Sequence, residues 1–282
     1  MRKLLLIMAL VVCTVAQAGK VVTDSINSRI LGEWVKYNVY LPNGFDQDTQ
    51  AHYPVVYLLH GLTDNYTAWR DRGQMQTVID ELIETGEAKP MVVIMPNAGG
   101  PNRYEIWNGY FNMPGWSYED FFFKELLPQA EQKYRAGGSK GQRAVMGLSM
   151  GGGGSTVYGQ RHTDMFSSVF AMSAWLTSED MRQREAGVED KLYLLNKAVK
   201  EHSALDFVRN ADEATVNKLR SVKWFIDCGD DDFLFIQNVQ LHQLMRQKGI
   251  KSELRVRNGQ HNWEYWHYSI RMAFPYASRN FF

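Results

Sequence analysis

The sequence has few cysteines and no excess of charge of either sign. Its 282 residues include only two cysteines, Cys13 and Cys228, and 31 basic residues balance 31 acidic ones. A formal net charge of zero provides neither the basic surface that binds nucleic acid nor the polybasic segment that binds a membrane surface. No cluster of cysteine and histidine has zinc-site spacing, and no acidic loop has calcium-site spacing. The sequence therefore predicts no nucleic-acid partner, no metal and no cofactor.

The sequence also has no apolar run long enough to span a membrane, and its most continuous apolar run is a short one near the N-terminus. Two basic residues precede the apolar run Leu4–Cys13, and the small-residue pattern Ala16-Gln17-Ala18 follows it. This order is typical of a secretory signal peptide, and the run is too short to span the ~30 Å core of a bilayer. We expect residues 1–18 to be a cleaved signal peptide and the mature protein to be periplasmic or secreted, with no membrane span. A buried N-terminal strand or helix, or lipid attachment at Cys13, are the alternatives.

Loss of the signal peptide would leave Cys228 as the single cysteine of the mature chain. An intramolecular disulfide is then impossible. Because Cys228 lies inside an apolar run, we expect it to be a small buried residue without a catalytic role.

Short apolar runs alternate with longer amphipathic stretches along the remaining chain. The expected strands are Val35–Leu41, Val55–His60, Met91–Pro96, Arg143–Leu148, Ser168–Ser173, Trp224–Cys228 and Glu253–Arg257. The expected helices are Gln74–Glu84, Ser117–Tyr134, Gly152–Gln160, Ala211–Arg220, Gln237–Lys248 and Trp263–Phe274. This alternation predicts an α/β fold with a mostly parallel central sheet and helices on both faces. No linker or repeat interrupts it, so we expect residues 19–282 to form a single domain, in which the charged stretch Ser178–Glu201 is a solvated helical excursion.

One motif carries clear chemical information. The expected strand Arg143–Leu148 leads into Gly147-Leu148-Ser149-Met150-Gly151, and a helix of small residues follows. A serine on such a sharp strand-to-helix turn projects its hydroxyl into a cleft, and the flanking glycines avoid collisions with the turn. This context predicts that Ser149 is a nucleophile.

A serine nucleophile needs a basic histidine, which in turn needs an orienting acid. On this kind of turn the chain order is serine, acid, histidine. His261 fits the base, because it lies in a loop after the last expected strand, at the same sheet edge as the serine. The acid should follow the strand Trp224–Cys228, where three aspartates occur in a row, and their spacing does not choose between Asp230, Asp231 and Asp232.

Two backbone N–H groups should stabilise the oxyanion that forms during attack on an ester, each contributing ~3 kcal/mol. One belongs to Met150, the residue after the nucleophile, and the other to Leu62, in the loop after the strand Val55–His60. Gly61 allows the chain to leave that strand sharply. We expect His60, directly before this turn, to have a structural hydrogen-bonding role rather than to act as a base.

These motifs together resemble those of the esterase-D-type branch of the α/β-hydrolases. That branch includes feruloyl and acetylxylan carbohydrate esterases, tributyrin esterase and S-formylglutathione hydrolases. The resemblance covers essentially the whole mature chain and rests on Leu-Leu-His60-Gly61, Val-Ile-Met-Pro96-Asn97, Gly147-Leu-Ser149-Met-Gly151-Gly152, Cys-Gly229-Asp-Asp-Asp232-Phe-Leu and Gly259-Gln-His261-Asn-Trp. It implies the α/β-hydrolase fold, and it implies Asp232 as the acid, because in relatives the acid is the third residue after the strand-ending glycine.

Aromatic residues gather in loops at the same sheet edge. Four of them are candidates for stacking on a sugar or a phenolic ring: Trp107, Tyr110, Trp175 and Trp263. Packing within the loops is the alternative for each.

We therefore expect an exported serine carboxylesterase that hydrolyses feruloyl or acetyl esters on plant-polysaccharide-derived carbohydrate. Its partner would be a small-molecule or oligosaccharide ester. The alternatives are a general short-chain acyl esterase, an enzyme like S-formylglutathione hydrolase, an acyltransferase with the same triad, and a non-catalytic carbohydrate-binding relative.

Overall fold

The computed structural model describes residues 18–99, 109–178 and 191–282. Their central feature is an eight-stranded sheet with the order β1-β2-β4-β3-β7-β8-β9-β10. The strands are β1 (Lys20–Asn27), β2 (Trp34–Leu41), β3 (Val55–Leu59), β4 (Val92–Met95), β7 (Arg143–Leu148), β8 (Ser168–Met172), β9 (Lys223–Gly229) and β10 (Ser252–Arg257). The pairs β1–β2 and β2–β4 are antiparallel, and every other neighbouring pair is parallel. A small hairpin, β5 (Asn112–Met113) with β6 (Trp116–Ser117), lies outside this sheet.

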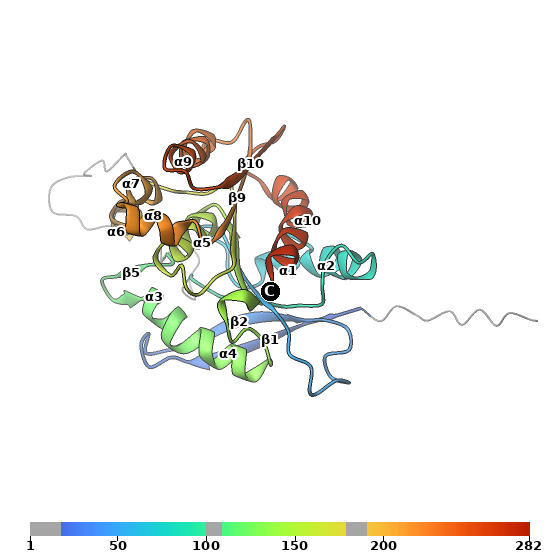
Figure 1. The fold of residues 1–282 in the computed structure, drawn as a ribbon. Coiled ribbons are helices and arrows are strands. Elements are labelled where there is room, and N and C mark those ends of the chain that lie inside the picture. The colour runs from blue at the N-terminus through green and yellow to red at the C-terminus, as the bar shows by residue number, and fades with distance from the viewer. Residues whose placement is uncertain (1–17, 100–108, 179–190) are drawn as a thin grey trace, which may run out of the picture.

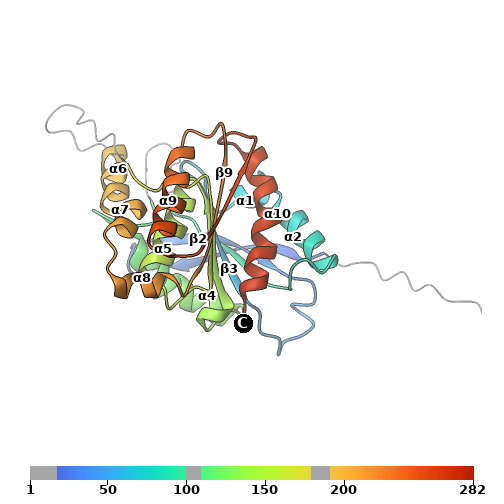
Figure 2. The same ribbon diagram turned by 45° about the horizontal axis from the view of Figure 1, so that its top comes forward.

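Helices cover both faces of the sheet (Figures 1 and 2). The first face carries α2 (Met75–Glu84) and α10 (Trp263–Asn280), with the short helix α1 (Ala68–Asp71) beside them. The other face carries α4 (Leu127–Lys133), α5 (Met150–Arg161), α6 (Lys191–Glu201), α7 (Ala204–Arg209), α8 (Glu213–Leu219) and α9 (Phe235–Gln247). Helix α3 (Tyr118–Phe121) joins α4 through the π-helical turn η1 (Phe122–Leu126), and a 3₁₀ turn, η2 (Lys140–Gln142), precedes β7.

Strand β3 shows why the sheet needs helices on both sides. Val55, Tyr57 and Leu59 belong to the hydrophobic core on one face, whereas Val56 and Leu58 belong to the core on the other. Side chains alternate between the two faces of a strand, so a continuously apolar strand must be covered twice. The predicted α/β class, with a mostly parallel sheet between helices, is confirmed.

Each strand expected from the sequence is present, but some elements differ from the prediction. Strand β1 was not predicted, because its Lys-Val-Val-Thr-Asp-Ser-Ile-Asn sequence is mostly polar and it pairs only at the edge of the sheet. Helix α10 does not stop at Phe274 but continues through Pro275, because the turn beyond the proline buries Tyr276 and Ala277 against the core.

The charged stretch Ser178–Glu201 is only partly within the described residues. Its second half forms α6, which buries Leu195, Ala198 and Val199 against the core. This part is therefore a packed helix with one apolar face rather than a solvated excursion. Across the described residues, no helix combines the length and apolar character needed to cross a membrane.

Candidate active site

Ser149 occupies a strained turn between the central strand β7 and helix α5. Its backbone angles are φ 53° and ψ −116°, a conformation that side chains rarely adopt. The turn is held tightly, since Ser149 N donates to Met172 O at 2.9 Å and Ser149 O accepts from Trp175 N at 2.9 Å. A Cβ on Gly151 would lie 2.5 Å from the carbonyl oxygen of Leu59 on the neighbouring strand. The glycine two residues after the serine is thus required by the close approach of β3.

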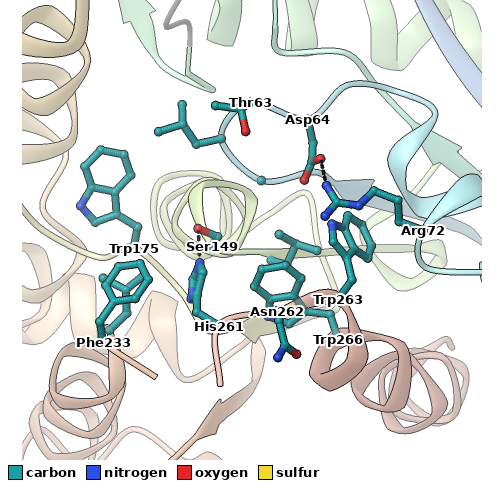
Figure 3. A pocket seen from close by; sticks show the side chains of 14 residues that line it. Thr63, Asp64, Arg72, Ser149, Trp175, Phe233, His261, Asn262, Trp263 and Trp266 are labelled. Atoms are coloured by element: carbon teal, nitrogen blue, oxygen red, sulfur yellow. Dashed lines mark hydrogen bonds and ion pairs between the residues drawn. The ribbon is translucent and has the colours of Figure 1, made fainter. Parts of the chain in front are cut away.

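Three side chains form a continuous hydrogen-bonded chain at the carboxyl edge of the sheet. His261 Nε2 lies 2.9 Å from Ser149 Oγ, and His261 Nδ1 lies 2.8 Å from Asp232 Oδ2. His261 follows β10 and Asp232 follows β9, so parallel strands bring their loops to the serine. This arrangement can move a proton from the serine hydroxyl to the imidazole while the carboxylate holds the ring. Figure 3 shows the Ser149 and His261 side chains meeting at the centre of a cavity.

The carboxylate of Asp232 is buried, with the side chain inaccessible to solvent. Burial alone would raise its pKa, but hydrogen bonds from His261, from Leu234 N (2.8 Å) and from the Ser173 hydroxyl outweigh burial and lower it. Ser173 is itself fully buried and accepts a hydrogen bond from Trp266 Nε1 at 3.0 Å. The ring of Trp266 in turn meets His261 edge-on at 4.8 Å. Ser173 and Trp266 therefore support the acid and the imidazole from behind.

Backbone hydrogen bonds join the loop that carries the acid to the loop that carries the histidine. Asp230 N donates to Arg257 O and Asp231 N donates to Gly259 O, both at 3.1 Å, and Gly259 N returns a bond to Asp230 Oδ1 at 3.0 Å. The three adjacent aspartates consequently differ in place. Asp230 fixes the neighbouring loop, Asp231 is exposed, and Asp232 reaches the imidazole.

Behind these loops lies a buried ionic cluster centred on Asp227. This side chain is fully buried and accepts hydrogen bonds from Arg257, Tyr265 and Ser269. The guanidinium of Arg257 also lies 4.1 Å from the centre of the Tyr265 ring. The cluster ties β9 and β10 to α10, and it is separate from the hydrogen-bonded chain at Ser149.

The loop after β3 lies beside Ser149 and is fixed by His60. His60 Nδ1 bonds Gly61 O at 2.8 Å, and His60 Nε2 accepts from Ala98 N at 3.0 Å. Complete burial lowers the pKa of His60 to about 4, which keeps the ring neutral. Leu62 follows on this loop and lines the cavity, and Met150 opens α5, where a backbone N–H has no partner within the helix. Of the two residues predicted to stabilise the oxyanion, Leu62 therefore shares the cavity with Ser149 and Met150 follows it directly in the chain.

The position of Tyr110 corrects the expectation that it binds substrate. Its side chain is 1% exposed, and its hydroxyl donates to His60 O at 3.0 Å. Its ring packs edge-on against Tyr118 and Tyr158. Tyr110 therefore supports the loop after β3 from the core, because the rings of Tyr118, Tyr158 and His60 surround its own ring and it does not line the cavity.

The cavity at Ser149 has a volume of about 590 Å³. It contains both Trp175 and Trp263, as the sequence suggested, whereas Trp107 lies outside the described residues. The cavity is lined by Gly61, Leu62, Thr63, Asp64, Arg72, Leu148, Ser149, Trp175, Phe233, Leu234, His261, Asn262, Trp263 and Trp266.

Three of these lining residues, Asp64, Arg72 and Phe233, were not predicted from the sequence. Charged residues in a short polar loop carry no periodic signal, and Phe233 could have been noticed only because it follows Asp232 directly.

Cys228 is a free, completely buried thiol, and burial raises its pKa, which disfavours the thiolate that a nucleophile would need. Among residues 18–99, 109–178 and 191–282, no group of three or more histidine, cysteine, aspartate or glutamate side chains is placed to hold a metal.

A family model and several known proteins resemble this chain, most of them over the greater part of its length. A family model described as "Putative esterase" matches residues 28–277. The solved structure of a ferulic acid esterase is 46% identical, covers 94% of this chain and 99% of its own, and superposes with a TM-score of 0.90. An endo-1,4-beta-xylanase/feruloyl esterase of Xylanibacter ruminicola is 34% identical over 143 residues, which are 49% of this chain but 19% of that longer protein. An acetyl esterase of Caldicellulosiruptor saccharolyticus is 23% identical over 248 residues, 83% of this chain and 87% of its own.

Proposed function

This chain belongs to the esterase family of α/β-hydrolases and is a carboxylic ester hydrolase, and from that premise we propose that it cleaves feruloyl-type esters of carbohydrate through Ser149, His261 and Asp232. The observation that carries the proposal is the hydrogen-bonded chain of these three side chains inside an aromatic-lined cavity. The similarity to a ferulic acid esterase supports the aromatic acyl group, and that to the xylanase/feruloyl esterase supports a plant-polysaccharide source.

In the proposed mechanism each of these residues has a defined step. Ser149 Oγ attacks the ester carbonyl carbon while His261 Nε2 takes its proton, and the carbonyl oxygen becomes an oxyanion. The backbone N–H groups of Met150 and Leu62 stabilise that charge. His261 then gives the proton to the departing alcohol oxygen, which leaves an acyl group on Ser149. A water molecule, deprotonated by His261, hydrolyses the acyl-enzyme and restores the serine.

Asp232 keeps the imidazole in the tautomer that accepts a proton at Nε2. Because the pKa of Asp232 is lowered, the carboxylate stays ionised throughout the pH range in which an esterase works, and it stabilises the positive charge that His261 acquires. The sequence of the first 18 residues supports export, which would place the enzyme with polysaccharide esters outside the cytoplasm.

An acetyl ester is the second candidate substrate, since the acetyl esterase of Caldicellulosiruptor saccharolyticus matches most of this chain. A comparison of kcat/KM for methyl ferulate, acetylated xylan and 4-nitrophenyl acetate would decide between the two acyl groups. We expect methyl ferulate to be favoured by at least tenfold over 4-nitrophenyl acetate after allowance for their intrinsic reactivities. A preference for acetyl esters would reject the feruloyl assignment and leave the triad in place.

Labelling with a fluorophosphonate tests the nucleophile directly. The wild-type protein should take up one equivalent, and Ser149→Ala should take up none and lose several orders of magnitude in kcat. Ser155→Ala is a matched control, because Ser155 lies on the same helix with its hydroxyl bonded to Gly152 O at 2.9 Å, away from the cavity. Full labelling of Ser149→Ala would show that another residue is the nucleophile.

A further inference from the structure

The cavity has two chemically different walls on opposite sides of Ser149 and His261 (Figure 3). Trp175 and Phe233 form an apolar wall on one side, and Phe233 is 76% exposed despite its size. Asp64, Arg72 and Trp263 stand on the other side. An ester placed with its carbonyl carbon at Ser149 Oγ must direct its acyl group towards one wall and its alcohol towards the other.

The second wall is a compact unit of one carboxylate, one guanidinium and one indole. Arg72 Nη1 donates to Asp64 Oδ1 at 2.9 Å, and the guanidinium carbon lies 5.1 Å from the centre of the Trp263 ring. The Trp263 ring is held edge-on by Trp69 at 5.1 Å and by Trp266 at 5.5 Å. The indole therefore has a fixed position, and the guanidinium that pairs with Asp64 lies over its ring.

The charges and exposure of Asp64 and Arg72 indicate which class of ligand this wall can bind. The Asp64 side chain is 7% exposed, whereas that of Arg72 is 51% exposed, so the guanidinium offers further donors to the cavity. The paired carboxylate cancels the positive charge, which removes the attraction that an anionic ligand would need. A neutral ligand with many hydroxyl groups matches this wall, because hydroxyls both accept from a guanidinium and donate to a carboxylate. An apolar face of a sugar ring would pack against the part of the indole that lines the cavity.

We propose that Asp64, Arg72 and Trp263 form a subsite for the neutral sugar that carries the ester, and that the acyl group lies against Trp175 and Phe233. This assignment rests on the proposed function for the identity of the ester, but the sugar subsite itself does not depend on catalysis. It makes Arg72 a specificity-determining residue. The guanidinium end of the Arg72–Asp64 pair is half exposed, and glutamine at position 72 keeps an N–H donor for the nearly buried carboxylate, so Arg72→Gln should act mainly on binding.

Kinetics on two esters of the same acid test the direction of binding. The two substrates are methyl ferulate, whose alcohol is methanol, and a feruloylated arabinose oligosaccharide. In Arg72→Gln, kcat/KM for the oligosaccharide should fall at least fivefold further than kcat/KM for methyl ferulate, mainly through KM. Arg70→Gln is the matched control, since Arg70 pairs with Asp71 on the adjacent helix α1 and does not line the cavity. It should leave both values unchanged.

Equal losses on the two esters, or no loss on either, would overturn the sugar subsite. Binding of the unesterified arabinose oligosaccharide to Ser149→Ala, followed by calorimetry, gives a second result that needs no turnover. Adding Arg72→Gln should weaken this binding at least fivefold, and adding Arg70→Gln should not. Tighter binding of an oligosaccharide of uronic acids would overturn the neutral class. If the wild-type enzyme cleaves neither ester but binds the oligosaccharide through Arg72, the proposed function fails and the subsite stands.

Discussion

Replacing Asp232 by asparagine removes one negative charge and reverses one hydrogen bond. Asp232 accepts bonds on both oxygens, from Leu234 N at 2.8 Å and from His261 Nδ1 at 2.8 Å. An asparagine keeps the first bond through its carbonyl oxygen and then presents its amide nitrogen to His261. Because that nitrogen is a donor, the imidazole must accept at Nδ1 and carry its proton on Nε2. In this tautomer the ring cannot take the proton of Ser149.

The size of the effect follows from the role of the ring. Loss of the correct tautomer should lower kcat by about 10³ to 10⁴, which corresponds to about 4–5.5 kcal/mol of transition-state stabilisation. The side chain of residue 232 fills the same volume in both forms, so the fold should persist. The assay is kcat on methyl ferulate at neutral pH, with the melting temperature measured alongside.

Asp231→Asn is the matched control, since it removes the same charge one residue away from an exposed position. Its kcat should change by less than threefold. The reasoning would be refuted if Asp231→Asn lost more activity than Asp232→Asn, or if Asp232→Asn kept a tenth of the wild-type kcat. Either result would mean that Asp232 does not orient His261 in the active enzyme.

Two further predictions concern groups around the site. Burial lowers the pKa of His60 to about 4, so between pH 6.5 and 4 the unfolded chain binds a proton that the folded chain does not. The free energy of unfolding should therefore fall by about 3 kcal/mol as the pH drops through this window. His60→Gln should flatten that part of a plot of melting temperature against pH. Ser173→Ala should lower kcat about tenfold, because Asp232 loses a donor and the buried Trp266 Nε1 loses its acceptor. Ser173 has a positive φ of 46°, so Ser173→Gly, which relieves that strain, should show the same loss; recovery of kcat in the glycine variant would point to the backbone instead.

Much of the fold could be predicted because the apolar sequences of the central strands are compatible with few alternative structures. Val55–Leu59 and Ser168–Met172 are buried at every position, and such continuous apolar runs bounded by helices have few other solutions. Strand β1 could not be predicted in the same way, since its polar residues depend on pairing with β2 rather than on burial. The continuation of α10 past Pro275 is decided by packing, which overrides the local preference of proline.

In the candidate site, too, residues placed by local sequence could be predicted, and residues placed by tertiary packing could not. Ser149 and His261 could be placed from their loops, because a strand order and a turn geometry determine both. The choice of acid among three adjacent aspartates needed the resemblance to a family, because only the path of the backbone decides which carboxylate turns inward. Arg72 could not be predicted, since its partners Asp64 and Trp263 come from separate segments and meet only in the folded chain.

The position of β10 at the end of the sheet has a consequence for inactivation by heat. This strand pairs only with β9. Charged, exposed residues such as Glu253 and Arg255 alternate along it with partly buried ones. Ser149 instead follows β7, which is buried between β3 and β8. Local opening begins at the less buried margins of a fold, and although Arg257 anchors one end of β10, the strand is paired on one side only, so β10 and the His261 loop should separate before the centre of the sheet. We therefore expect warming to disconnect the imidazole while the serine turn remains folded, so that activity is lost reversibly several degrees below the temperature at which the whole chain unfolds.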